Sequence, residues 1–339
     1  MQIAFILVLA LICAIAAWLF WLAKITQRET AKIHQAFPPI GEITKINGHD
    51  VHYIDTKGDA QDQATSFAVV FLHGASGNLR DPLHVFKDHL VDEARLIFID
   101  RPGHGWSTRD ETMNTPDQQA KQVIGLLDEI GVKQAVFIGH SYSGTLIATI
   151  ALDYPERVAG LLFNSPVSHP WPGGVSWYYH LASHPIIGPL FCNTLTLPIG
   201  LRQLECATQK VFWPNSVPDV YHNDIGNNMV LTPKRFRANA NDIAVLRDFV
   251  VEQSKRYGEI AVPTTIITGD KDQIVLPWVH SEGLARDIKD PRTRLIYLKD
   301  AGHMPHHHAA DLFAEEIRLL IDEVRPARQS PPNQLLSST

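Results

Sequence analysis

The sequence contains only three cysteines among 339 residues, Cys13, Cys192 and Cys206. Three scattered cysteines are too few for a disulfide framework, and none lies in a CxxC pair of the kind used in metal or redox sites. Cys192 and Cys206 could pair in an oxidising compartment, although two buried free thiols are favoured because free cysteine is so often buried. The chain also has no excess of basic residues, since 30 Lys and Arg against 36 Asp and Glu give a formal net charge of -6 at pH 7. Without a cluster of Lys and Arg to neutralise phosphates, nucleic acid is not an expected partner.

The start of the chain has no charged residue from Ile3 to Ala23, and Lys24, Arg28 and Lys32 follow this run. A helix of that length crosses a hydrocarbon core, so residues 1–24 are predicted to be a single transmembrane anchor. A cleaved signal peptide is the alternative, but no basic segment precedes the run, and the run is longer than the apolar region of such peptides. Positive charge on the C-terminal flank alone favours a cytoplasmic position for the rest of the chain. A single segment nevertheless leaves periplasmic or lumenal exposure open.

The remainder of the chain alternates short β-branched runs with helical patterns, which predicts an α/β protein with a parallel sheet wrapped by helices. Residues 25–41, which contain Pro38 and Pro39 near their end, are interpreted as a tether. The sheet domain is predicted to comprise residues 42–164 and 260–325. The alternation stops over residues 165–259, which are rich in aromatics and prolines. We expect this stretch to be a helical cap over the carboxyl edge of the sheet, where open α/β folds bind ligands. The Pro- and Ser-rich residues 326–339 are expected to be a disordered tail.

The first two predicted strands are connected through Asn47-Gly48, a pair that is typical of a β-hairpin turn. Strands are expected at Glu42–Ile46, Val51–Asp55, Phe67–Leu72, Arg95–Asp100, Ala135–Gly139, Val158–Asn164, Thr264–Thr268 and Arg294–Leu298. Helices are expected at Pro82–Val91, Pro116–Ile130, Ser143–Tyr154, Trp278–Ile288 and Ala309–Val324, with a further helical segment at Asn239–Tyr257 in the cap.

The sharpest local pattern is a buried strand that runs into Gly139-His140-Ser141-Tyr142-Ser143 and then into a helix. A serine at this position would lie on a strained strand-to-helix turn, with its hydroxyl exposed above the sheet. The fifth position is serine where glycine is usual, so Ser143 competes with Ser141 as the candidate nucleophile. Ser141 is preferred because it lies at the end of the strand and has a glycine two residues before it.

A serine hydroxyl is a weak nucleophile and needs a base that a third group orients. The acid and then the histidine are expected later in the chain. Asp270 and Asp272 follow one predicted strand, and His303 follows the last one, so both loops could converge on Ser141. His303 competes as the base with the run of three histidines at 306–308. These adjacent histidines point in different directions and lack acidic or Cys partners at ligand spacing, so no metal site is predicted.

The turn after the strand at 67–72 supplies His73, Gly74 and Ala75. We expect the backbone amides of Ala75 and Tyr142 to form an oxyanion hole, and His73 to bind loop backbone as a structural residue. The glycine-rich segment from Asp100 to Ser107 is interpreted as a turn that shapes the fold beside the site. It lacks the Lys-Ser/Thr ending of a phosphate-binding loop.

The segments HGASG, DRPGHGWS, GHSYSG, YPERV, GDKDQIV and AGHMPH follow one another between Ile43 and Val324. In this order they resemble the α/β-hydrolase superfamily. The resemblance implies a mostly parallel eight-stranded sheet with strand 2 antiparallel, a cap after strand 6, a triad of Ser141, Asp272 and His303, and no cofactor. Asp272 is preferred to Asp270 because it matches the superfamily's Gly-x-x-Asp pattern. Epoxide hydrolases and haloalkane dehalogenases carry an aspartate at the nucleophile position, so Ser141 argues against those chemistries.

Among superfamily members the chain looks similar to membrane-bound monoacylglycerol lipases and to bacterial lid-bearing esterases and carbon–carbon bond hydrolases. We therefore expect a membrane-bound serine hydrolase that cleaves a carboxylic ester through an acyl-enzyme. Lipophilic esters such as monoacylglycerols are included among the expected substrates. Cleavage of a carbon–carbon bond in a diketone ring-fission product is the second enzymatic hypothesis. A non-catalytic binding protein on the same fold is the alternative from another class. The expected partners are a small-molecule ester or acyl substrate and the membrane, with no metal and no nucleic acid.

Overall fold

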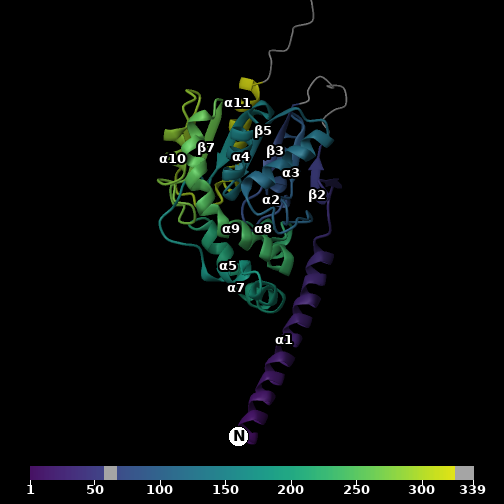
Figure 1. The fold of residues 1–339 in the computed structure, drawn as a ribbon. Coiled ribbons are helices and arrows are strands. Elements are labelled where there is room, and N and C mark those ends of the chain that lie inside the picture. Colours follow the sequence, from purple (N-terminus) through teal and green to yellow (C-terminus); the bar gives the residue numbers. More distant parts are fainter. Residues whose placement is uncertain (57–66, 325–339) are drawn as a thin grey trace, which may run out of the picture.

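The computed structural model describes residues 1–56 and 67–324, and the tail predicted at 326–339 lies outside this described part. Its centre is an eight-stranded sheet in the order β1-β2-β4-β3-β5-β6-β7-β8 (Figure 1). β2 pairs antiparallel with β1 and β4, and all later neighbours pair in parallel. The expected mostly parallel sheet with an antiparallel second strand is therefore confirmed. The strands are β1 (Glu42–Ile46), β2 (His49–Asp55), β3 (Phe67–Leu72), β4 (Leu96–Ile99), β5 (Gln134–His140), β6 (Val158–Asn164), β7 (Thr264–Gly269) and β8 (Arg294–Leu298).

The first hairpin turns where the sequence predicted it, with Ile46 paired to His49. Asn47 and Gly48 between them have φ values of 51° and 85°. Positive φ at both central residues is what a two-residue hairpin of this twist requires, and Asn-Gly provides it with little strain.

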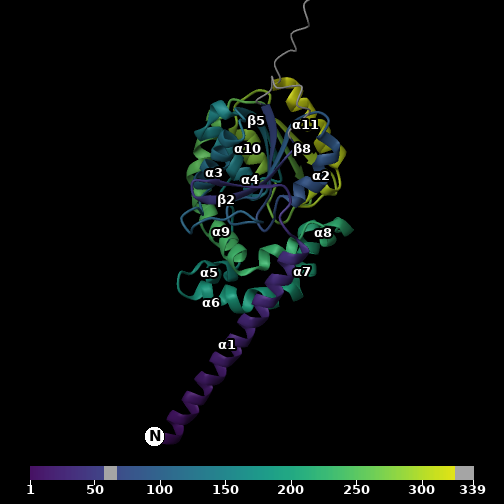
Figure 2. The same cartoon turned by 90° about the vertical axis from the view of Figure 1, so that its right-hand side faces the viewer.

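Helices cover both faces of the sheet (Figures 1 and 2). One face packs against α3 (Pro116–Glu129), α4 (Tyr142–Asp153) and α10 (Ser281–Asp287), and the other against α2 (Arg80–Leu90) and α11 (Ala310–Val324). The parallel strands inside the sheet, unlike the edge strand β8, are buried on both sides, which explains their nearly continuous apolar sequences.

The stretch between β6 and β7 forms the cap, and it lies at the carboxyl end of the sheet near the emerging N-terminal helix (Figure 2). Its last helix continues the predicted segment at 239–257 but begins earlier, at Pro233, because Thr232-Pro233 is a favourable helix start. The cap elements are α5 (Trp177–Ser183), α6 (Ile187–Phe191), the π-helical turn η2 (Cys192–Thr196), α7 (Leu197–Phe212), α8 (Asp219–Asn223), the 3-10 turn η3 (Asn227–Leu231) and α9 (Pro233–Gln253).

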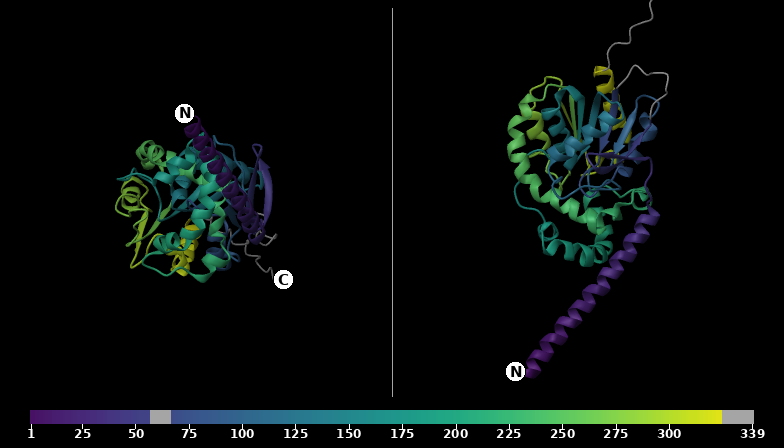
Figure 3. Two further views of the ribbon diagram at one scale, coloured as in Figure 1. Left: turned by 90° about the horizontal axis from the view of Figure 1, so that it is seen from below. Right: turned by 45° about the vertical axis from the view of Figure 1, so that its right-hand side comes forward.

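The N-terminal helix α1 (Gln2–Ala36) is longer than predicted and projects far from the body (Figure 3). Residues 25–36, which were predicted to belong to a tether, continue the helix of the apolar run. The sequence has neither Gly nor Pro before Pro38, so nothing interrupts the helix until the residues that precede the proline pair. By length and composition, α1 is able to cross a membrane.

Candidate active site

Ser141 lies at the turn between β5 and α4, at the carboxyl edge of the sheet. Its backbone adopts φ 52° and ψ -114°, which non-glycine residues rarely do. The turn is tight because a Cβ added to Gly139 would lie 2.4 Å from the Ser143 carbonyl oxygen. Glycine at 139 therefore lets strand and helix approach closely enough to hold Ser141 at the apex.

The structure brings Ser141, His303 and Asp272 together. Ser141 Oγ lies 3.0 Å from His303 Nε2, and His303 Nδ1 donates to Asp272 Oδ2 over 2.7 Å. The other carboxylate oxygen of Asp272 accepts the backbone N–H groups of Ile274 and Val275 at 2.8 and 2.9 Å. All three side chains are buried, so the carboxylate is fixed in place and the imidazole has one nitrogen directed at the serine.

The competing residues do not join this arrangement. Ser143 is fully buried, and its hydroxyl donates to the His73 carbonyl oxygen at 2.6 Å. Asp270 forms an ion pair with the neighbouring Lys271 at 3.2 Å. Their hydrogen bonds give these two residues structural partners away from His303.

Ala75 and Tyr142 flank the serine from two elements. Tyr142 is the first residue of α4, so its amide has no acceptor within the helix, and Ala75 follows β3 in the adjacent loop. Both residues line the same cavity as Ser141. The loop passes directly against Ser141, since a Cβ on Gly74 would lie 3.1 Å from the Ser141 Cβ. This placement suits two amides that act on one oxygen bound at the serine.

The loop that carries Ala75 is supported by Arg101, whose side chain is completely buried. Its guanidinium donates to the carbonyl oxygens of His73 and Gly74, each at 3.2 Å, and lies 4.1 Å from the Tyr142 ring centroid. Burial, and then the nearby Arg101 charge, lower the pKa of His73 to about 3. His73 is therefore neutral, and its Nε2 accepts the Arg101 amide at 3.0 Å. The structural role predicted for His73 is confirmed, but the sequence did not indicate the role of Arg101.

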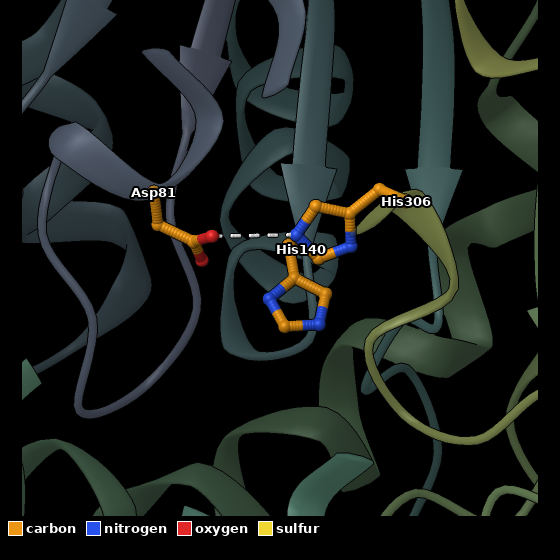
Figure 4. Close-up of side chains that lie close together, drawn as sticks. All are labelled: Asp81, His140 and His306. Atoms are coloured by element: carbon orange, nitrogen blue, oxygen red, sulfur yellow. Dashed lines mark ion pairs between the residues drawn. The ribbon is translucent and has the colours of Figure 1, made fainter. Parts of the chain in front are cut away.

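A second cluster lies beside His303 and contains Asp81, His140 and His306 (Figure 4). His140 Nε2 donates to the His303 carbonyl oxygen at 3.1 Å. His306 and His307 direct Nε2 at Asp81 Oδ1, at 3.5 and 2.7 Å. The sequence showed no acidic partner for the histidine run at ligand spacing. The structure supplies one in Asp81, which lies 226 positions from His307 in the chain.

The ionisation of this cluster follows from its burial. Burial alone would raise the pKa of Asp81, but hydrogen bonds from His306 and His307 outweigh it and place that pKa well below its usual value. Burial lowers the pKa of His306 to about 4 and that of His140 well below 6.5. The cluster is thus a carboxylate beside the neutral imidazoles of His140 and His306.

The same cluster has the donor types of a zinc site, with ligand atoms of Asp81, His140 and His306 within 4.8 Å of one another. His306 is already oriented by Asn164, whose Nδ2 donates to His306 Nδ1 at 2.8 Å. The free space beside these residues is about 10 Å³. Since this is at the lower limit for a single water and Asp81 already accepts two imidazole N–H groups, the geometry fits a support for the His303 loop better than a metal centre.

A cavity of about 850 Å³ lies over Ser141 and His303, between the sheet edge and the cap. Among the described residues that line it there is no Lys or Arg. Its cap wall is mainly apolar and aromatic, formed by residues that include Trp177, Tyr178, Phe191, Leu195, Ile199, Leu204 and Val211. A cavity of this size and lining suits a neutral, largely apolar organic molecule.

Comparisons with known proteins agree with this architecture. The model of a family described as the alpha/beta hydrolase family matches residues 69–316. Lipase 3 of Moraxella sp. is 25% identical over 305 residues, covering 89% of this chain and 90% of the lipase. The 2-hydroxy-6-oxo-6-phenylhexa-2,4-dienoate hydrolase of Comamonas testosteroni is 27% identical over 274 residues, 76% of this chain and 87% of that enzyme.

Among solved structures, the meta-cleavage product hydrolase of Pseudomonas fluorescens superimposes with a TM-score of 0.65 at 19% identity, over 84% of this chain and 98% of that one. At this identity the likeness concerns the fold alone. The matched share of a relative's own length differs widely, from 32% in one relative to 98% in another. The shared region is therefore the hydrolase fold, and the relatives carry several different activities.

Proposed function

The chain belongs to the alpha/beta hydrolase family, and from this premise we propose that it is a serine hydrolase that cleaves carboxylic esters through an acyl-enzyme. The observation that carries the proposal is the chain of contacts Ser141–His303–Asp272, at 3.0 and 2.7 Å. A nucleophile, a base within hydrogen-bond reach and a group that orients the base are the three parts that acyl transfer to serine requires.

In the acylation step, His303 Nε2 takes the Ser141 proton as Oγ attacks the ester carbonyl carbon. The carbonyl π electrons move to oxygen, and the amides of Ala75 and Tyr142 stabilise the resulting oxyanion. When the intermediate collapses, the bond to the alcohol oxygen breaks and His303 returns the proton to the leaving alkoxide. Asp272 keeps the imidazole in the orientation and tautomer that both transfers need.

In the deacylation step, a water molecule takes the place of the alcohol. His303 removes its proton as the oxygen attacks the acyl carbon, and the same two amides hold the second oxyanion. Collapse releases the carboxylic acid, and the proton returns from His303 to Ser141.

We propose a lipophilic acyl substrate, such as a monoacylglycerol, and a membrane-bound enzyme. Two observations support this choice: the cavity beside Ser141 has an apolar cap wall, and α1 is long and apolar enough to cross a bilayer. The same triad chemistry could serve a carbon–carbon bond hydrolase. A dienoate substrate, however, carries a carboxylate, and the described cavity lining offers it no Lys or Arg. A neutral ester is therefore the better fit.

Labelling with a fluorophosphonate tests the nucleophile directly. The wild-type chain and Ser143→Ala are expected to be labelled, whereas Ser141→Ala is not labelled and His303→Ala is labelled far more slowly. Ser143→Ala is the matched control because it removes a hydroxyl two residues away that donates to backbone. Full labelling of Ser141→Ala would reject Ser141 as the nucleophile, and an unlabelled wild-type chain would favour a binding protein.

The substrate class needs a separate assay. p-Nitrophenyl esters of increasing acyl length and a monoacylglycerol should be cleaved, with kcat/KM rising as the acyl chain lengthens to fill the cavity. A strict preference for acetate, or cleavage of a ring-fission dienoate in their place, would reject the lipophilic-ester proposal.

A further inference from the structure

The second half of α1 packs along the cap. Leu22, Thr26 and Ile33 are the buried residues of this helix. Thr26 Oγ1 donates to the Thr194 carbonyl oxygen of η2 at 3.3 Å, and Ile33 packs against residues of α7 and η3. Their spacing of four and seven residues places them on one side of the helix. The cap therefore has a fixed position along the length of α1.

This contact begins inside the uncharged run, because Leu22 precedes Lys24, the first charged residue of the chain. At a rise of about 1.5 Å per residue, Leu22 lies within roughly one turn of the charged end of the run. Trp18 and Trp21 are exposed on α1 near Leu22, at the charged end of the run. Tryptophan is enriched where a membrane helix meets the membrane surface. If the run occupies the hydrocarbon region, the cap meets the membrane at the depth of the lipid headgroups.

The part of the cap at this level is unusual in its sequence. Between Arg157 and Arg202 there is no Asp, Glu, Lys or Arg, although 19% of the whole chain is charged. Five large apolar side chains are exposed to solvent on α5, α6 and α7 or on the residue just before α6. This set, called the cap apolar face below, is Trp177, Ile186, Ile187, Leu190 and Ile199, with exposures of 70, 80, 48, 51 and 45%. Exposed apolar residues gathered without charge are typical of an interaction surface.

The cap apolar face is also the rim of the cavity. Trp177 and Ile199 are exposed and line the cavity as well. Phe191 lines the cavity from α6, the helix that carries Leu190 on its outer side. Residues of the cap apolar face therefore line the cavity over Ser141 directly.

We propose that the cap apolar face lies in the surface of the bilayer that α1 crosses, and that substrate passes from the lipid into the cavity between Trp177 and Ile199. The inference rests on the proposed function for the nature of that substrate. A lipid surface is favoured over a protein partner because α1 already fixes the depth of the cap. A protein would also have to fit between this face and the membrane.

Depth-dependent quenching tests the contact itself. In the full chain with Cys13→Ser and Cys206→Ser, an environment-sensitive fluorophore is attached at Ile186→Cys and, as the matched control, at Leu319→Cys. Leu319 is 45% exposed on α11, far from the cap in Figure 1. In phosphatidylcholine vesicles with brominated acyl chains, emission from position 186 should fall by about half or more while position 319 is unaffected. Equal emission loss, or none, at the two positions overturns the proposal.

Kinetics test the passage of substrate. Ile186→Glu/Leu190→Glu changes two residues that do not line the cavity, so hydrolysis of p-nitrophenyl butyrate in detergent should stay unchanged. Hydrolysis of monoacylglycerol in vesicles should fall about tenfold, since charge in this face opposes its contact with lipid, whereas Leu319→Glu should have no effect. Unchanged vesicle activity in the double variant contradicts the proposal. The quenching measurement does not need catalysis and can be repeated on Ser141→Ala. A failure of the proposed function is therefore distinguishable from a failure of the lipid contact.

Discussion

Arg101 of the sheet domain and Asp242 of the cap form a completely buried ion pair, with Nη1 of the arginine 2.9 Å from Oδ2 of the carboxylate. Arg109 contacts the other oxygen of Asp242. Because Arg101 also holds the carbonyl oxygens of His73 and Gly74, this pair joins α9 of the cap to the loop that carries Ala75. Cap position and the proposed oxyanion hole are therefore linked through one carboxylate.

Replacing that carboxylate should destabilise the protein strongly. Asp242→Asn leaves two buried guanidinium groups without a counter-charge, so the free energy of unfolding should fall by about 3–5 kcal/mol. Denaturant unfolding in detergent micelles measures the change. Asp153→Asn is the matched control, because Asp153 pairs with Arg256 at the surface, where the loss should be at most about 1 kcal/mol. Equal losses in the two variants would contradict the role given to the buried pair.

Asp272→Asn should lower kcat by about 10⁴ and leave KM nearly unchanged, because the amide cannot hold His303 in the tautomer that accepts the serine proton. Ester hydrolysis under saturating substrate measures this effect. Asp270→Asn provides the comparison and should retain wild-type kcat, since Asp270 contacts Lys271. If Asp270→Asn were the more damaging change, the acid of the triad would have to be reassigned.

Asp81 is expected to act as a positioning residue, since it holds the turn that follows His303. Asp81→Asn replaces an acceptor of two imidazole N–H groups by an amide, and kcat should fall by about 10- to 100-fold with little change in KM. The rate of fluorophosphonate labelling should fall in parallel, because it depends on the same base. A variant that only loses stability, with normal kcat per folded molecule, would show that the cluster in Figure 4 has no influence on His303.

Acid should destabilise the protein between pH 6.5 and about 4. Burial lowers the pKa of His306 to about 4 and those of His73 and His280 to about 3, from an unfolded value near 6.5. In this range the unfolded chain binds protons that the folded chain does not. Each histidine therefore lowers the free energy of unfolding by about 1.4 kcal/mol per pH unit as the pH falls.

Denaturant midpoints at pH 7.5, 6.5 and 5.5 measure this dependence. The free energy of unfolding should fall less steeply with decreasing pH in His306→Gln than in the wild type, because one group that takes up a proton on unfolding has been removed. The exposed His180 is the control position, and His180→Gln should leave the slope as it is. Identical slopes in all three proteins would show that His306 is not held neutral in the fold.

The strands were the most predictable part of the fold. β1, β3, β6 and β8 have the bounds that the sequence pattern predicted, because β-branched runs end at clear turn signals. The helical end of α1 was not predicted. Polarity suggested a tether after Lys24, but the contact of Thr26 and Ile33 with the cap stabilises a helix there, and that contact depends on the tertiary structure.

The candidate site divides in the same way. Ser141, Asp272 and His303 follow strands in recognisable motifs, and the order of those motifs along the chain was enough to propose them together. Asp242 and Asp81 could not be found by such reasoning. Each forms ion pairs or hydrogen bonds with residues more than a hundred positions away in the chain. No local sequence pattern indicates that two such distant groups pair in the folded protein.

α1 runs from Gln2 to Ala36 without a glycine or proline, so it behaves as one stiff rod that ends against the cap. A stiff helix in a bilayer adjusts its tilt to the thickness of the hydrocarbon layer. A change of tilt at one end of a rod moves whatever is fixed to the other end. In the membrane-bound enzyme proposed above, a change in membrane thickness therefore shifts the cap over Ser141 and changes the rate of the proposed hydrolysis.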